Sequence, residues 1–192
     1  MVNLDMENGL RRVLITGGAR SGKSHFAQDM AAKSGKPVLF VATAEAGDEE
    51  MRRRIQAHQN SRPASWRTIE AATGVGERIA AGIGDSHLVL VDCATLLVSN
   101  VMSQFLSADG NDVDELASEG AVAAEISGLV DCLLKVEADF IIVTNEVGLG
   151  LVPDNRLGRV YRDLLGKANQ VLAAASDEVY FMVAGLAIKA KP

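Results

Sequence analysis

The sequence predicts a single α/β domain, with a mostly parallel sheet that is flanked by helices on both faces. Short runs that are apolar throughout alternate with segments of helical period, which is typical of strands buried on both sides. Only 4% of the 192 residues are aromatic while 48% are hydrophobic, so the core consists mainly of aliphatic side chains. This composition favours helices packed on a buried sheet. The length corresponds to about 1.3 average domains, so we expect one domain.

The expected elements follow one another in regular order. Residues 1–11 show no periodicity and are expected to form a mobile leader, whereas 12–192 form the domain. The first helix begins at Lys23, and Gly35 and Pro37 end it. The expected strands are 13–16, 38–41, 66–70, 88–91, 140–143 and 179–183, and the further helices are 48–58, 76–83, 95–106, 113–137 and 155–175.

The charge balance argues against a nucleic-acid partner. The chain has 19 basic and 25 acidic residues, a net charge of −6 and a sequence pI of about 5.1. Its densest basic run, Arg52–Arg54, directly follows Asp48–Glu50 and is typical of a solvated helix face. Duplex binding depends on neutralising phosphates, for which such a chain is poorly suited.

The sequence also favours a cytoplasmic protein without a membrane span. The longest uncharged apolar run, 179–188, is about half of the roughly 20 residues that a spanning helix needs. The N-terminal residues include no apolar stretch of the kind found in export signals. Cys93 and Cys132 lie in apolar segments, so both are expected to be reduced core residues.

A phosphate-binding motif stands between the first strand and the first helix. It fits G-x-x-x-x-G-K-[ST] at every fixed position, and its residues are Gly17, Gly18, Ala19, Arg20, Ser21, Gly22, Lys23 and Ser24. Glycines let backbone N–H groups surround phosphate oxygens, and the helix N-terminus adds about half a positive charge. Lys23 can reach the β- and γ-phosphates, and the Ser24 hydroxyl can ligate Mg²⁺. We therefore expect a P-loop NTPase fold of the RecA-like kind.

A magnesium nucleotide also needs an acidic residue at the end of a neighbouring strand. Asp92 directly follows the apolar run 88–91 and is the candidate for this role. Asp is also a favoured helix N-cap, so Asp92 could instead begin the next helix. Thr95 could serve as that cap and leave Asp92 to the metal. These residues predict binding of a nucleoside triphosphate with Mg²⁺ without indicating what happens to the phosphate.

The three histidines do not reveal a role by their spacing. His58 shares the apolar stripe of Met51 and Ile55, which is typical of a core or surface histidine, although a neutral imidazole can also attack phosphorus. His25 lies beside Ser24, and His87 precedes an apolar strand.

A loop at 145–156 follows the buried strand 140–143. The carboxyl edge of such a sheet is where α/β proteins bind ligands. Arg156, Arg159 and Arg162 would add positive charge near this loop, or they could form an ordinary solvated helix face.

Longer segments carry a resemblance to one known family. They are the extended motif 15–24, then 41–44, 48–51, 54–58, 62–64 and 66–68, and later 143–148 and 152–157. Together these segments resemble the bifunctional adenosylcobinamide kinase/adenosylcobinamide-phosphate guanylyltransferase family of cobalamin biosynthesis. The likeness extends from Arg12 to Lys189. The combination of two motifs is far more specific for this family than a P-loop alone. The motifs are Gly-Gly-Ala-Arg-Ser-Gly-Lys-Ser at 17–24 and Thr-Asn-Glu-Val-Gly at 144–148.

The resemblance implies roles for further residues. His58 matches the histidine that becomes guanylylated in that family, although this chain has Ala57-His58 where some members have two histidines. Glu70, Thr43 and Arg62 match positions that contact the nucleotide. Asp92 stands where the family often has Glu, so its side chain is one methylene shorter.

The resemblance further implies two reactions in one domain, with ATP and GTP as substrates and Mg²⁺ as cofactor. The chain would first phosphorylate adenosylcobinamide and then transfer GMP from GTP through a guanylyl-histidine to give adenosylcobinamide-GDP. Members of the family assemble as homotrimers, which we expect here too. Two other readings stay open: a P-loop kinase that does not use His58, and a nucleotide switch without turnover.

Overall fold

A computed structural model describes residues 9–44 and 62–191 of the chain. The strands are β1 (Arg12–Gly17), β2 (Val38–Ala42), β3 (Arg67–Glu70), β4 (Leu88–Asp92), β5 (Asp139–Val143), β6 (Glu178–Val183) and β7 (Leu186–Lys191). The helices are α1 (Lys23–Lys33), α3 (Val75–Gly82), α4 (Ala94–Ser103), α5 (Glu115–Lys135) and α6 (Arg156–Ala175). These elements confirm all six predicted strands and five predicted helices, while the helix predicted at 48–58 lies outside the described residues.

The seven strands form one sheet in the order β3-β2-β4-β5-β1-β6-β7. Every neighbouring pair is parallel except β6 and β7, which confirms the mostly parallel prediction. All residues of β2 and β5 are buried, because helices or neighbouring segments cover both faces of the central strands. The parallel strands β1 to β6 therefore end at one edge, where the loops of the candidate site lie.

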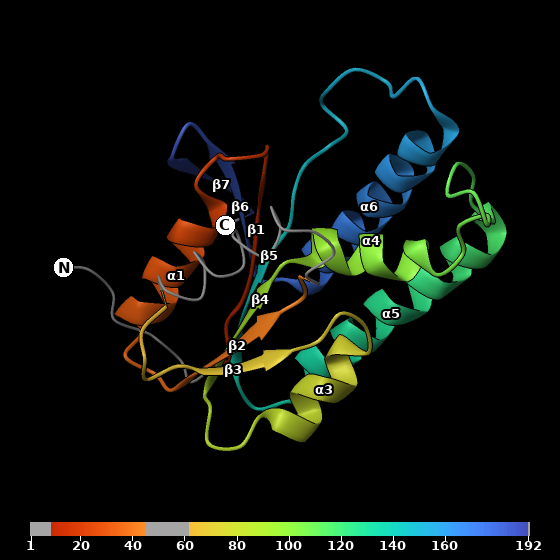
Figure 1. Cartoon of the computed structure of the whole chain (residues 1–192). Helices are drawn as coiled ribbons and strands as arrows, with labels where there is room; N and C mark the ends of the chain where they lie inside the picture. Colours follow the sequence, from red (N-terminus) through yellow and green to blue (C-terminus); the bar gives the residue numbers. More distant parts are fainter. Residues whose placement is uncertain (1–8, 45–61, 192) are drawn as a thin grey trace.

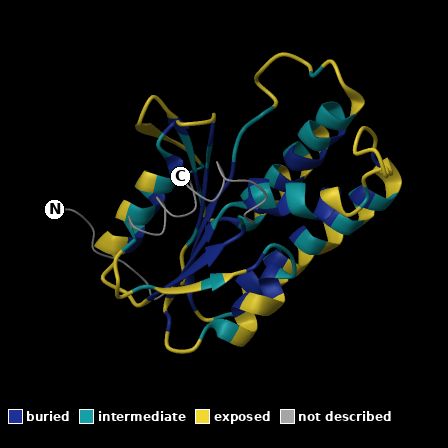
Figure 2. Cartoon of the chain, viewed as in Figure 1, coloured by how far each residue is buried: buried dark blue, intermediate teal, exposed yellow. Residues whose placement is uncertain are grey.

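Helices cover both faces of the sheet, but unequally. Among the described residues, α1 alone covers one face, and α3, α4, α5 and α6 cover the other (Figure 1). Successive strand residues point to opposite faces, so Phe40 packs with the α1 layer while Leu39 and Val41 pack with the larger layer. The buried residues follow the sheet and the inward sides of the helices (Figure 2).

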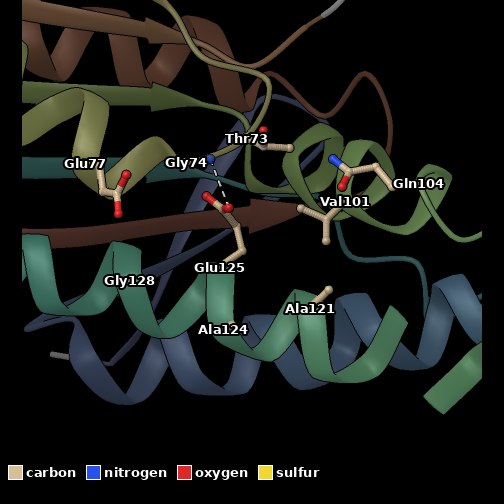
Figure 3. Close-up of a pocket in the computed structure, with 10 residues that line it drawn as sticks. Thr73, Gly74, Glu77, Val101, Gln104, Ala121, Ala124, Glu125 and Gly128 are labelled. Atoms are coloured by element: carbon tan, nitrogen blue, oxygen red, sulfur yellow. Dashed lines mark hydrogen bonds between the residues drawn. The ribbon is translucent and has the colours of Figure 1, made fainter. Parts of the chain in front are cut away.

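A cavity of about 430 Å³ lies between α3, α4 and α5 (Figure 3). The carboxylate of Glu125 accepts hydrogen bonds from the backbone N–H groups of Gly74 and Val75, both at 2.9 Å. It thereby replaces the side-chain cap that α3 lacks at Gly74. Next to it, a Cβ on Gly76 would lie 2.4 Å from the carbonyl oxygen of Gly128, so α3 and α5 are in close backbone contact. We therefore attribute this cavity to the packing of the three helices.

The C-terminal residues form a hairpin that the sequence analysis missed. One last strand was expected at 179–183, whereas β7 pairs antiparallel with β6 and forms the edge of the sheet. Ala184 and Gly185 connect the two strands with φ values of 50° and 82°, as in the tight turns that fit a twisted hairpin. Ala-Gly is a weaker hairpin signal than Asn-Gly, and the run 179–188 therefore resembles one continuous apolar segment.

Arg11, which directly precedes β1, is attached to this hairpin through Glu178. The Glu178 carboxylate pairs with Arg11, with Lys189 at 2.9 Å and with the Tyr180 hydroxyl at 2.7 Å. The hydrogen bond from Arg11 is the largest of the effects that lower the pKa of Glu178 from 4.5 to about 2.

We expect the Glu178 contacts to make stability dependent on pH. A carboxyl group with a lowered pKa stabilises the fold above its ordinary pKa, and this contribution disappears as the pH falls through the folded value. Glu178→Gln should therefore reduce the free energy of unfolding by about 1 kcal/mol at pH 7 and by almost nothing near pH 2. Urea unfolding at pH 7, 4 and 2.5 measures the difference.

The control for this experiment is Asp131→Asn, because its ion pair with Lys135, at 3.3 Å on the exposed side of α5, is the one found for it among residues 9–44 and 62–191. It should change stability by less than Glu178→Gln at pH 7. A Glu178→Gln deficit that stays constant between pH 7 and 2.5 would contradict the expected linkage.

Both cysteines are unpaired thiols, as the sequence analysis expected. Cys132 is buried and Cys93 is partly buried. Burial raises the pKa of each thiol to about 11, so both are protonated at neutral pH. Within 9–44 and 62–191, no helix is both long enough and apolar enough to cross a bilayer.

Candidate nucleotide site

The P-loop connects β1 to α1, as predicted. Gly17 has a φ of +146°, and a Cβ there would lie 2.3 Å from the carbonyl oxygen of Met182, so only glycine fits. Gly22 precedes α1 with a φ of 96° and provides no side-chain cap. The N–H groups of the first turn of α1 therefore have no side-chain acceptor, and they suit an anionic ligand.

Lys23 is held inside the loop that it belongs to. Only 7% of the residue is exposed, and its Nζ donates a hydrogen bond of 2.6 Å to the carbonyl oxygen of Gly18. Burial lowers the pKa of Lys23, and this effect outweighs the charge of Asp92, which raises it. The Asp92 carboxylate therefore interacts electrostatically with the lysine. The loop thus directs a desolvated cation toward the position where an anion would bind.

Asp92 ends β4 at the same sheet edge, but β4 is not the neighbour of β1. β5 lies between them: in the sheet register Asp92 pairs with Val143, and Val143 pairs with Ile15 on its other side. Asp92 was expected at the end of a neighbouring strand, and the strand that carries it is the second one from β1. Two strand spacings separate the P-loop strand from β4, roughly 10 Å.

The start of α4 also differs from the expectation. Cys93, which is joined to Asp92 by a cis peptide bond, is the N-cap residue and makes no side-chain cap. Thr95 lies inside the helix, and its hydroxyl accepts the backbone N–H of Asn145 at 2.6 Å. Neither Asp92 nor Thr95 is therefore the N-cap residue of the helix.

The residues Thr43, Arg62 and Glu70 gather around the adjacent end of β2. Thr43 is fully buried, and its hydroxyl accepts from the Cys93 N–H at 2.7 Å and donates to the Cys93 carbonyl oxygen at 2.8 Å. Glu70 is exposed at the end of β3, level with Ala42. Thr43 therefore fixes the turn that carries Asp92, and its side chain is already engaged.

Arg62 is the cation of this second group. Its guanidinium carbon lies 3.6 Å from the centroid of the Phe40 ring. Burial lowers the pKa of Arg62, and the charges of Asp92 and Glu70 raise it. Arg62 is thus within electrostatic reach of both carboxylates, and Asp92 lies within reach of both cations, Lys23 and Arg62. Four predicted site residues that are far apart in the sequence are brought to one region.

The donor set fits Mg²⁺. Among the described residues, no cluster of three His, Cys, Asp or Glu side chains could enclose a metal ion. A hydroxyl at Ser24 and a carboxylate at Asp92 are hard oxygen donors, and Mg²⁺ in phosphate chemistry takes few protein ligands together with water and phosphate oxygens. These two residues would hold the ion.

The loop after β5 is fixed by contacts that the sequence analysis did not single out. The Glu146 N–H donates to the Gly17 carbonyl oxygen at 3.0 Å, and the Asn169 side chain donates to the Asn145 carbonyl oxygen at 2.9 Å. The Asn100 side chain similarly donates hydrogen bonds to the carbonyl oxygens of Thr43 and Ala72, at 2.8 and 3.1 Å. These roles of asparagine could not be predicted from the sequence, because the side chains bind backbone atoms that are far away along the chain.

The three arginines expected near this loop make different kinds of contact. Arg156 pairs with Asp112 and Glu115 at the start of α5, and Arg159 donates to the carbonyl oxygens of Pro153 and Asp154 at 3.0 and 2.8 Å. Arg162 pairs with Asp163 at 3.2 Å. The ion pairs of Arg156 and Arg162 favour the solvated-face alternative, whereas Arg159 contacts the loop itself. His58, the predicted nucleophile, lies outside the described residues.

Comparison with solved structures agrees with the class that this fold and loop define, a P-loop nucleotide-binding protein. An ATPase of the type III secretion system of pathogenic bacteria superposes with a TM-score of 0.56 over 93% of this chain and 56% of its own, at 14% identity. This likeness concerns the fold alone. The sequence model of the family described as cobinamide kinase/cobinamide phosphate guanyltransferase matches residues 13–190. The chain belongs to this family of bifunctional kinases and guanylyltransferases.

Curated relatives are similar over nearly their full length. The bifunctional adenosylcobalamin biosynthesis protein CobU of Escherichia coli (strain K12) is 42% identical over 93% of this chain and 99% of its own. The corresponding protein CobP of Pseudomonas aeruginosa is 41% identical over 94% of this chain and 97% of its own. The family resemblance predicted from the sequence is thereby confirmed.

Proposed function

We propose that the chain phosphorylates the hydroxyl of adenosylcobinamide with ATP or GTP and then transfers GMP from GTP to the product. The observation that carries this proposal is the buried Lys23 inside a complete P-loop, within electrostatic reach of Asp92 at the same sheet edge. This arrangement suits phosphoryl transfer, which depends mainly on positioning and on neutralising charge. The identity of the acceptor is inferred from the family and from the curated relatives.

In the kinase step, the residues of the chain bind and orient the triphosphate. The N–H groups at the start of α1 and the Lys23 ammonium hold the phosphate oxygens. Ser24 and Asp92 would hold Mg²⁺, which supplies charge neutralisation on the phosphates when bound. Arg62 contributes a second cation beside Asp92 and Glu70, suited to the other end of the nucleotide or to the leaving phosphates.

In the guanylyl step, His58 acts as the nucleophile. An imidazole nitrogen forms a bond to the α-phosphorus of GTP, the bond to the bridging oxygen breaks, and pyrophosphate leaves. A phosphate oxygen of adenosylcobinamide phosphate then attacks the same phosphorus, releases the histidine and gives adenosylcobinamide-GDP. The covalent intermediate divides one difficult displacement into two easier ones.

Two labelled nucleotides test the proposal on the purified full chain. With γ-labelled ATP and cobinamide, label should appear in the corrinoid; with α-labelled GTP alone, it should appear on the protein and survive alkali but not acid. Addition of cobinamide phosphate should then remove the protein label. Corrinoid phosphorylation without protein label would show a simple kinase, and nucleotide binding with neither reaction would show a switch.

The proposal extends to assembly and location. We propose a homotrimer that works in the cytoplasm on small-molecule substrates, without a nucleic-acid partner. The family resemblance supports the trimer, and the acidic composition, with a net charge of −6, supports the absence of nucleic acid. Light scattering of the purified chain should give three times the mass of 20.3 kDa.

A further inference from the structure

We propose that the segment 149–152, in the loop between β5 and α6, is the surface on which an apolar face of the acceptor alcohol lies. Resting on the proposed function, this inference assigns a binding site for the acceptor, as distinct from the nucleotide. The acceptor expected here is an alcohol attached to a broad ring system with aliphatic edges. The corrin ring of cobinamide is an example of such a ring system.

Three large aliphatic side chains are exposed within these four residues. Leu149, Leu151 and Val152 are 79%, 96% and 61% exposed. In Figure 2 the connection between β5 and α6 is the exposed arch above the carboxyl edge of the sheet. Single exposed leucines are ordinary, but a cluster in one loop typically marks a binding surface. The connection has no regular structure from 144 to 155, a length that is uncommon unless the loop is functional.

The loop is anchored at both ends, so the apolar segment is held in a definite place. At the start, Glu146 is hydrogen-bonded to Gly17, and the Asn145 backbone is held by Thr95 and Asn169. At the end, Arg159 holds the carbonyl oxygens of 153 and 154. None of these contacts uses the aliphatic side chains of 149–152, so folding does not explain why those side chains are apolar.

The position of the loop indicates the acceptor rather than the nucleotide. Its first anchor is Gly17, the residue that opens the P-loop, so a molecule lying along 149–152 can extend to the phosphate end of the site. A nucleoside triphosphate is strongly polar and is served by Lys23, Arg62 and the start of α1. The acceptor must bring one hydroxyl to the γ-phosphate, and an apolar surface beside the P-loop would orient the rest of it.

Substitutions that keep size and remove apolar character test this assignment. The triple variant Leu149→Asn, Leu151→Asn, Val152→Thr should raise the Kd and KM for cobinamide at least about 10-fold, because buried aliphatic contacts are replaced by polar groups. The KM for ATP and the amount of protein label from α-labelled GTP should stay within about twofold, since neither involves the acceptor. Cobinamide is coloured, so equilibrium dialysis measures its binding without turnover.

Leu116→Asn and Leu134→Asn are the matched controls. Both leucines are exposed on α5, at 83% and 57%, and belong to no such cluster. They should leave cobinamide binding unchanged.

An unchanged Kd for cobinamide in a folded triple variant would overturn the assignment, as would an equal rise in the KM for ATP. A change in oligomeric mass by light scattering would also overturn it, because the segment would then cover another copy of the chain. If the wild type binds cobinamide through this segment but transfers no phosphate, the proposed function fails while the binding surface stands. If the wild type does not bind cobinamide at all, both fail.

Discussion

Lys23→Ala is expected to reduce both the phosphorylation of cobinamide and the guanylylation of the protein by at least ~10²-fold. Both reactions use a triphosphate held in the same loop, and loss of one preorganised charge contact to a transition state has an effect of this size. The contact is preorganised because Nζ is already fixed on the Gly18 carbonyl oxygen in a buried position. Initial rates with γ-labelled ATP and label yields with α-labelled GTP measure the two effects.

The control is Lys33→Ala, which removes the same side chain from the exposed last turn of α1. It should leave both rates unchanged. Thermal unfolding of Lys23→Ala should show a folded protein, because the substitution removes a desolvated cation whose pKa is lowered by burial. Wild-type phosphorylation by a folded Lys23→Ala variant would contradict the role of this lysine.

His58→Ala is expected to abolish covalent guanylylation while leaving part of the kinase activity. The groups proposed for γ-phosphoryl transfer, Lys23, Ser24 and Asp92, remain in this variant. Transfer of GMP needs a nucleophile at the α-phosphorus, and without it no phosphoramidate can form. Gel autoradiography with α-labelled GTP, beside a kinase assay with cobinamide, measures both activities on the same preparation.

The other two histidines provide the controls. His87 precedes β4 at the amino end of the sheet, opposite the edge that carries the P-loop. His25 is 83% exposed in its side chain and lies 3.6 Å from Asp29. Replacing either by Ala should leave the protein label intact. Alkali-stable label in His58→Ala would refute this histidine as the nucleophile, and loss of both activities in a folded variant would mean that it positions the nucleotide for both steps.

The central part of the fold could be predicted because its signals are local. Apolar runs such as 88–91 and 140–143 are buried on both sides, so their composition alone identifies them as parallel strands. β7 could not be identified in this way. Its side chains are mostly exposed, and its only signal was a turn at Ala184-Gly185 inside an apolar run.

The site was predicted where a motif fixes the chemistry and was missed where tertiary contacts decide. The P-loop residues follow from their spacing, since the glycine at 17 is required by the carbonyl oxygen of Met182 and the lysine by the phosphate. The order of strands is not written in any one segment, so the position of β5 between β1 and β4 was not foreseen. The electrostatic grouping of Arg62 with Asp92 and Glu70 likewise depends on strands that meet only in the folded sheet.

The turn of the C-terminal hairpin also contacts the P-loop: the Gly185 N–H donates to the Ser21 carbonyl oxygen at 3.1 Å, and a Cβ on Gly22 would lie 3.4 Å from the Gly185 Cα. We therefore expect phosphate binding and the order of the last two strands to be thermodynamically linked. A nucleotide that rigidifies the loop should protect the hairpin amides from hydrogen exchange, and by reciprocity fraying of the C-terminus should weaken nucleotide affinity. The exposed edge strand β7 would thus contribute to the free energy of phosphate binding.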